Sequence, residues 1–165
     1  MIKSGESAFP VWLAVILGTW AILVGVGRAP TTLKVGSVHT SPSAQRVEVP
    51  VELRTTGNSN LVALQIVLEY DSQRLTFNEV TRGPVAEQAG KDVSANGATP
   101  GRVSIVIFGM NQNPIKDGTL ALLKFTLSVR QRGAAPVRVT KVTATDARGR
   151  AVSVETISGK VNIGS

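Results

Sequence analysis

Residues 64–75 of the chain read Leu64-Gln65-Ile66-Val67-Leu68-Glu69-Tyr70-Asp71-Ser72-Gln73-Arg74-Leu75. Large apolar side chains occupy every second position up to Tyr70, which is the period of a strand with one buried face. The inward positions are Leu64, Ile66, Leu68 and Tyr70, and the outward positions are Ala63, Gln65, Val67 and Glu69. The pattern stops at Asp71, whose carboxylate can cap a turn by accepting hydrogen bonds from backbone N–H groups. It resumes at Leu75, so the segment predicts a half-buried strand, a turn and a second strand.

Strand-like segments bounded by Gly, Pro, Asn and Ser continue on both sides of this one. We expect strands at residues 33–38, 45–54, 62–70, 75–82, 102–108, 119–129, 137–145 and 152–163, and a short one near 92–95. Pro50 predicts that its strand lies at a sheet edge or carries a bulge, because proline cannot donate to a ladder. About nine short strands, with no long amphipathic helix in the domain, predict an all-β fold of two packed sheets. The expected core includes Leu64, Ile66, Leu68, Phe125 and Leu127.

The order of these strands and turns resembles the cohesin module from about residue 32 to 163. The resemblance is carried by residues 64–75 and by the turns that follow, which are Gly83, Pro100-Gly101, Asp117-Gly118 and Ser158-Gly159. Cohesins are non-catalytic β-sandwiches of nine strands in a jelly-roll arrangement, and they bind a partner module, the dockerin. The resemblance therefore implies that residues 32–165 form a protein-binding domain that works outside the cytoplasm.

The N-terminal 28 residues differ in character from the rest. No charged residue occurs between Glu6 and Arg28, and an uncharged run of this length can cross a bilayer as a helix. We expect residues 1–28 to be an uncleaved signal anchor with its amino terminus in the cytoplasm, or else a cleaved signal peptide. Residues 29–31 would then form a short tether. The first alternative predicts a single-pass protein of the cell membrane with an extracytoplasmic domain, and the second predicts a secreted one.

The composition argues against catalysis. The chain has no cysteine, which excludes disulfides, thiolate metal sites and a cysteine nucleophile. His39 is its one histidine and falls in an expected turn, and no cofactor motif is present. Glu48 and Glu52 share one strand face, but that face also carries the charged Arg54 and is expected to face solvent, whereas a glycosidase acid needs a sheltered cleft. Asp117-Gly118 reads as a hairpin turn. We therefore expect no enzyme activity, no cofactor and no metal.

The net charge is +7, and basic residues are densest between Arg130 and Arg150. Such a stretch could contact phosphates or anionic lipids. No aromatic side chains are interleaved with the charges, as single-strand binding would require, so we expect a solvated face and no nucleic-acid partner.

The resemblance to cohesins also suggests where a partner would bind. Cohesins use one sheet face, which corresponds here to strands 62–70 and 102–108 with nearby loops. The candidate contact residues are Ala63, Gln65, Val67, Ser104, Val106, Phe108 and Asn111. An outward Phe108 needs either a partner or a covering segment, and the alternative is that residues 83–101 or 111–114 lie over it.

Two positions depart from the family pattern. Where dockerin-binding cohesins carry an Asn and an Asp that hydrogen-bond the dockerin, this chain has Ala63 and Gln65. The sequence therefore leaves open whether the protein partner is a dockerin or another envelope protein. Polysaccharide binding is a second possibility, although Tyr70 is the one tyrosine and points inward. A structural role in an envelope or secretion assembly is the third.

Overall fold

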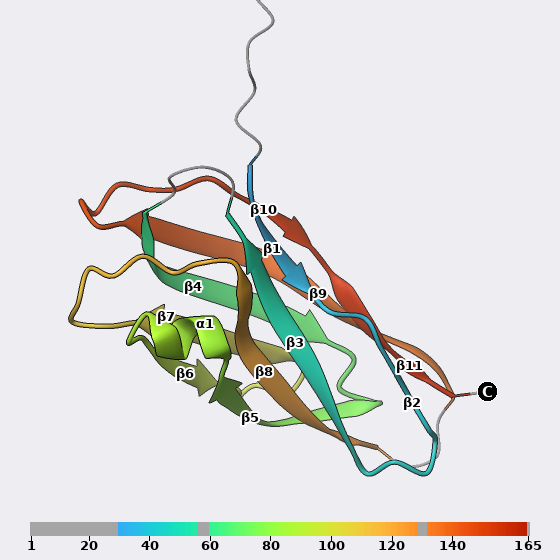
Figure 1. The fold of residues 1–165 in the computed structure, drawn as a ribbon. Helices are drawn as coiled ribbons and strands as arrows, with labels where there is room; N and C mark the ends of the chain where they lie inside the picture. The colour runs from blue at the N-terminus through green and yellow to red at the C-terminus, as the bar shows by residue number, and fades with distance from the viewer. Residues whose placement is uncertain (1–29, 56–59, 129–131, 165) are drawn as a thin grey trace, which may run out of the picture.

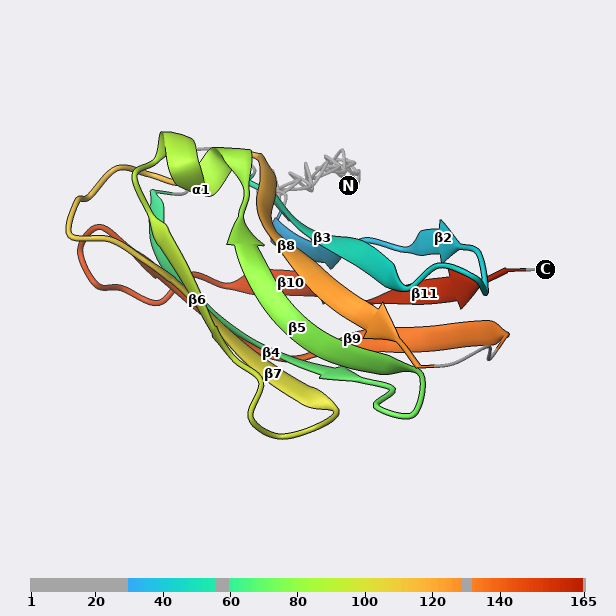
Figure 2. The ribbon, with the colours of Figure 1, turned by 90° about the horizontal axis from the view of Figure 1, so that it is seen from below.

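Two β-sheets pack face to face in the computed structural model, which describes residues 30–55, 60–128 and 132–164 (Figure 1). Within these residues lie eleven strands and one short helix: β1 (Thr31–Val35), β2 (Val38–Thr40), β3 (Arg46–Arg54), β4 (Leu61–Tyr70), β5 (Leu75–Arg82), α1 (Pro84–Gln88), β6 (Asp92–Asn96), β7 (Arg102–Phe108), β8 (Gly118–Leu127), β9 (Gly133–Asp146), β10 (Val154–Ile157) and β11 (Gly159–Ile163). One sheet has the order β10-β1-β3-β8-β5 and the other the order β2-β11-β9-β4-β7-β6. Figure 2 shows the two layers from below. The all-β sandwich expected from the sequence is confirmed.

The predicted signal anchor at residues 1–28 lies outside the described residues. Thr31, which we had assigned to the tether, is already the first residue of β1 and pairs with Val154. Among the described residues, no helix is both long and apolar enough to cross a membrane.

β4 occupies the interior of the six-stranded sheet, between β9 and β7. Its inward residues are buried as the alternation predicts, with Leu64, Ile66 and Leu68 at most 2% exposed. Asp71 caps the turn that follows, because its carboxylate accepts the Gln73 N–H at 3.0 Å.

The centre of the core is aromatic. Phe125 of β8 has no exposed surface, and its ring lies edge-on to Tyr70 of β4 and Phe77 of β5, at centroid distances of 5.2 and 5.8 Å. Phe125 therefore contacts aromatic side chains from both sheets. Leu127, also expected in the core, is only partly buried, because it pairs with Leu75 at the last residues of β8, where the sheet ends.

The predicted strands 33–38 and 152–163 are each split in two, which raises the strand number from nine to eleven. β1 and β10 pair in the five-stranded sheet, while their continuations β2 and β11 pair in the six-stranded one. The two chain segments cross between the sheets at Gly36 and Gly159. A Cβ at Gly159 would lie 2.6 Å from the Val35 carbonyl oxygen, so this close passage requires glycine. One consequence is that His39 lies in strand β2 and not in a turn.

Residues 83–101, where the sequence predicts only a short strand near 92–95, contain α1 as well as β6. The helix begins after Gly83 with Pro84 in its first turn, where proline has a suitable backbone angle and its missing N–H is not needed. Val85 and Ala86 are buried against the core. The five residues of α1 are too few to show the hydrophobic periodicity by which a helix is predicted from sequence.

The structure decides between the two alternatives for Pro50 and contradicts the hairpin predicted at Asp117-Gly118. β3 lies between β1 and β8, so the edge-strand alternative for Pro50 is wrong. The alternative of a bulged strand is supported, because β3 has a register irregularity next to Pro50, between Val51 and Glu52. Asp117-Gly118 does not form a hairpin, since β7 and β8 belong to different sheets. The Asp117 carboxylate instead accepts hydrogen bonds from the backbone N–H and the hydroxyl of Thr55.

Candidate partner-binding face

The outer face of the six-stranded sheet is built from β9, β4, β7 and β6, which are hydrogen-bonded neighbours in that order. β4 and β7 pair antiparallel, with Gln65 opposite Val106. β6 continues this row on the far side of β7, with Ser94 opposite Val106. The structure therefore brings the predicted positions of strands 62–70 and 102–108 onto one surface.

Apolar side chains are exposed along β7 and just beyond its end. Val106 is 38% exposed, Phe108 is 46% exposed and Met110 is fully exposed. These three residues occupy alternate positions and are called the β7 stripe below. Residues 92–96 lie beside β7 as strand β6 and do not cover it. The covered alternative for Phe108 is therefore wrong. An exposed apolar row on a sheet face is typical of a binding surface.

The other predicted contact residues differ in how much of their surface is exposed on this face. Gln65 is exposed, while Ala63 and Ser104 are partly exposed. Val67 is on the outer face but only 6% exposed, so it offers little contact area. Its neighbours in register are Ser104 and Lys141, and the β9 chain bulges at Thr140, whose hydroxyl donates to the Val67 carbonyl at 3.2 Å.

Charges of both signs surround the β7 stripe. Glu69 of β4 lies between Arg102 and Arg138 in register, and all three are exposed. Asp92 lies opposite Phe108 and pairs with Arg82 at 3.4 Å. The rim is thus mixed in charge, which favours a partner with both acidic and basic groups.

The basic stretch from Arg130 to Arg150 does not act as one surface. Arg130 lies outside the described residues. Arg150 contacts the Asp146 carboxylate at 2.7 Å, and the backbone N–H and guanidinium of Arg150 hold the pKa of Asp146 below its usual value. Arg138 lies in register with Glu69, as described above. Two of the basic residues in the stretch, Arg138 and Arg150, therefore have an acidic neighbour.

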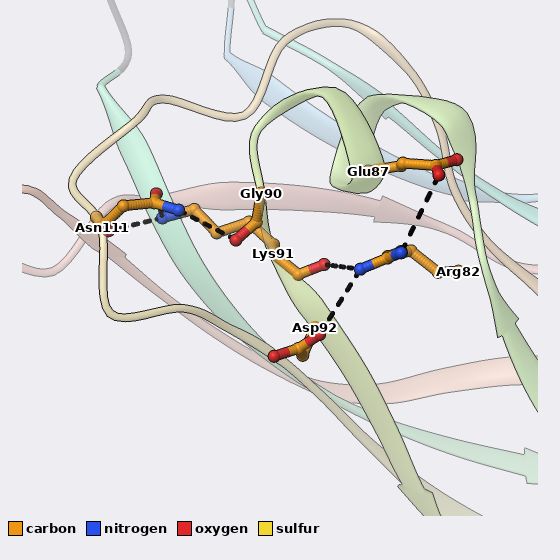
Figure 3. A network of polar contacts seen from close by, with 6 residues as sticks. All are labelled: Arg82, Glu87, Gly90, Lys91, Asp92 and Asn111. Carbon is orange, nitrogen blue, oxygen red and sulfur yellow. Dashed lines mark hydrogen bonds and ion pairs between the residues drawn. The ribbon is translucent and has the colours of Figure 1, made fainter.

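Asn111 is engaged inside the molecule (Figure 3). Its side-chain oxygen accepts from Lys91 Nζ at 2.8 Å, and its side-chain nitrogen donates to the Gly90 carbonyl at 2.9 Å. Lys91 has no exposed surface, and burial lowers the pKa of its ammonium. Among the described residues, no carboxylate forms an ion pair with Lys91. The side chain that we expected to contact a partner thus holds the local fold.

Sequence reasoning missed two residues of this region. Met110 continues the alternation of Ser104, Val106 and Phe108 by one step, but the predicted strand ended at 108. Lys91 had no signal, because a lysine before a short strand is normally solvated.

No catalytic centre is apparent in the part of the chain that the structure describes. No three His, Asp or Glu side chains there converge as a metal site would require. Glu52 points outward from the other sheet, where it lies 4.0 Å from Lys34.

The chain matches the sequence model of the cohesin domain over residues 31–163. Solved cohesin structures superimpose on it. The sixth cohesin of scaffoldin B from Acetivibrio cellulolyticus, solved in complex with a dockerin variant, is 20% identical with a TM-score of 0.74, covering 82% of this chain and 100% of that one. A non-cellulosomal cohesin from the archaeon Archaeoglobus fulgidus is 23% identical with a TM-score of 0.70, covering 83% and 93%. A Clostridium thermocellum cohesin in complex with a dockerin is 21% identical with a TM-score of 0.73, covering 82% and 100%. No curated protein sequence matches the chain.

The described residues form a two-sheet sandwich whose six-stranded sheet has a partly apolar, exposed outer face. The chain belongs to the cohesin domain family, as the match over residues 31–163 shows. The resemblance read from the sequence is confirmed.

Proposed function

We propose that the domain binds a dockerin-like protein module through the outer face of β9, β4, β7 and β6, and that it is not an enzyme. The observation that carries this proposal is the β7 stripe, whose three apolar side chains remain exposed along β7 and just beyond its end. Burying a side chain such as Phe or Met is worth about 1.5–3 kcal/mol, so the stripe can supply the apolar centre of an interface. The related cohesins from Acetivibrio cellulolyticus and Clostridium thermocellum were solved with dockerins, which supports this class of partner.

The polar part of the face predicts how the partner differs from a standard dockerin. Ala63 cannot hydrogen-bond through its side chain, and Gln65 carries no charge. A partner that relies on an amide and a carboxylate at these positions loses those bonds, which typically costs several kcal/mol when the matching groups stay buried and unpaired. We expect the natural partner to contact the β7 stripe more extensively and to place neutral groups over Ala63 and Gln65.

Binding can be tested with the full chain in nanodiscs, titrated calorimetrically with a panel of dockerin modules. At least one dockerin should bind with a dissociation constant of about 1 µM or tighter, which corresponds to about 8 kcal/mol. The Ala63→Asn, Gln65→Asp double variant should gain affinity for dockerins that bind standard cohesins. If neither protein binds any dockerin, the partner belongs to another class, and a pull-down from native membranes becomes the way to identify it.

The N-terminal segment predicts membrane attachment. We expect the full chain to fractionate with membranes and to resist carbonate extraction, since the sequence has no charge between Glu6 and Arg28. A soluble form that begins near Pro30 would show instead that the segment is a cleaved signal peptide. With its amino terminus in the cytoplasm, the anchored form would place the proposed binding face outside the cytoplasm, as would secretion of the cleaved form.

Polysaccharide binding is not favoured. Such sites commonly use exposed Trp or Tyr rings, whereas the described residues contain no Trp and the ring of Tyr70 is buried against Phe125.

A further inference from the structure

A buried lysine lies directly behind the end of the β7 stripe. Lys91 precedes β6, has no exposed surface and directs its ammonium at one residue, Asn111 (Figure 3). Lys91 Nζ donates to both the backbone carbonyl and the side-chain oxygen of Asn111, each at 2.8 Å. The side-chain nitrogen of Asn111 returns a hydrogen bond to the Gly90 carbonyl at 2.9 Å. Three hydrogen bonds thus join residues 90–91 to Asn111.

The alkyl part of Lys91 also fits closely against the chain. A Cβ at Gly109 would lie 2.9 Å from Lys91 Cδ and 3.0 Å from the Gly90 carbonyl oxygen. Gly109 therefore lies against the stem of Lys91 while Asn111 contacts its ammonium. Met110 lies between these two contacts, and its own side chain is fully exposed.

The buried ammonium of Lys91 is not explained by the stability of the core alone. Burial of an ammonium without a carboxylate partner is unfavourable, and only good hydrogen bonds offset the loss of water. The nearby acids are engaged elsewhere, since Asp92 and Glu87 pair with Arg82 at 3.4 and 3.8 Å. A leucine or methionine would fill the same space without that penalty. An apolar residue, however, could not donate hydrogen bonds to the backbone and side-chain oxygens of Asn111.

We propose that Lys91 is a positioning residue of the binding face, which fixes the backbone of residues 109–111 so that Met110 extends the apolar row of Val106 and Phe108. The role in binding rests on the proposed function, whereas the ordering of residues 109–111 does not. A pre-ordered segment loses less conformational entropy when a partner binds. Lys91 would therefore raise affinity without touching the partner.

The ordering is tested by backbone ¹⁵N relaxation on the full chain in nanodiscs. The order parameters of Gly109, Met110 and Asn111 should be about 0.85 in the unmodified protein and fall below about 0.6 in Lys91→Met. Asn111→Ala should have a similar effect, because it removes two of the three hydrogen bonds without altering the lysine. Lys34→Met is the matched control: it makes the same substitution in the other sheet, where Lys34 lies 4.0 Å from Glu52 and does not contact Asn111, and the three order parameters should not change. Unchanged order parameters in both Lys91→Met and Asn111→Ala would overturn the proposal.

The contribution to binding is tested with the Acetivibrio cellulolyticus dockerin or whichever dockerin the titrations retain. Lys91→Met should weaken binding about tenfold, which corresponds to about 1.4 kcal/mol, and Lys34→Met on the opposite sheet should not. In a Met110→Ala background the same substitution should have little further effect, because Lys91 acts through Met110. Equal losses in both backgrounds would show that Lys91 does not act through Met110 and would overturn its positioning role. If no dockerin binds the unmodified chain, the partner proposal fails and the order parameters alone decide the role of Lys91.

Discussion

Replacing Phe125 by Ala is expected to lower the free energy of unfolding by about 3–5 kcal/mol. The ring has no exposed surface and contacts Tyr70 and Phe77 edge-on. Its removal would leave a cavity between the two sheets that neither can close, because β8 is held between β3 and β5. The loss combines buried apolar area, two aromatic contacts and the cavity itself.

Chemical denaturation of the domain monitored by far-ultraviolet circular dichroism would measure this change. Leu127→Ala, two residues along the same strand, is the matched control, since Leu127 is only partly buried and should cost clearly less. Equal losses for Phe125→Ala and Leu127→Ala would contradict the described core, and a spectrum dominated by helix would contradict the fold.

The sequence predicted strands well where one face of a strand is buried and the other is solvated. β4 and β7 appear within one residue of their expected bounds, because alternation reports burial directly. The sequence predicted strand bounds poorly where the chain passes from one sheet to the other. Residues 33–38 and 152–163 were each interpreted as one strand because apolar residues occur on both sides of Gly36 and Ser158. Only β1 and β11 are well buried, whereas β2 and β10 are partly buried or exposed. The glycines that permit the crossing, Gly36 and Gly159, resemble ordinary turn residues until their neighbours are known.

The candidate site was predictable to the same extent. Alternation predicts that Gln65 and Val106 lie on the same sheet face, provided that β4 and β7 are neighbouring strands. The resemblance to the cohesin family supplied the pairing of these two strands. The nearly complete burial of Val67 was not predictable, because it accompanies a bulge in β9, a strand distant in sequence. The internal role of Asn111 depends on Lys91, twenty residues earlier, and no local pattern connects them. Local sequence thus predicts which face a side chain occupies, whereas bulges and long-range polar contacts decide how much of it a partner can reach.

Ile107 and Phe108 offer the sharpest test of the binding face, because they are adjacent on β7 and point in opposite directions. Ile107 has no exposed surface, whereas Phe108 is 46% exposed. Phe108→Ala should weaken partner binding by about 1–3 kcal/mol and change the free energy of unfolding by less than about 1 kcal/mol. Ile107→Ala should do the reverse, with a loss of stability of about 2–5 kcal/mol and little change in affinity while the protein remains folded.

Both quantities should be measured for both variants, by denaturation and by calorimetric titration with the same dockerin. The pair controls for strand position, because any general disturbance of β7 would affect both variants alike. Loss of stability in Phe108→Ala would mean that the ring packs on the fold more than its exposure indicates. Retained affinity in a stably folded Phe108→Ala protein would move the interface to another surface. If Phe108 and Ile107 lie on opposite faces of β7, the two substitutions must have opposite effects. The outward residue then contributes to binding and the inward residue to stability, because successive residues of a strand point to opposite faces of the sheet.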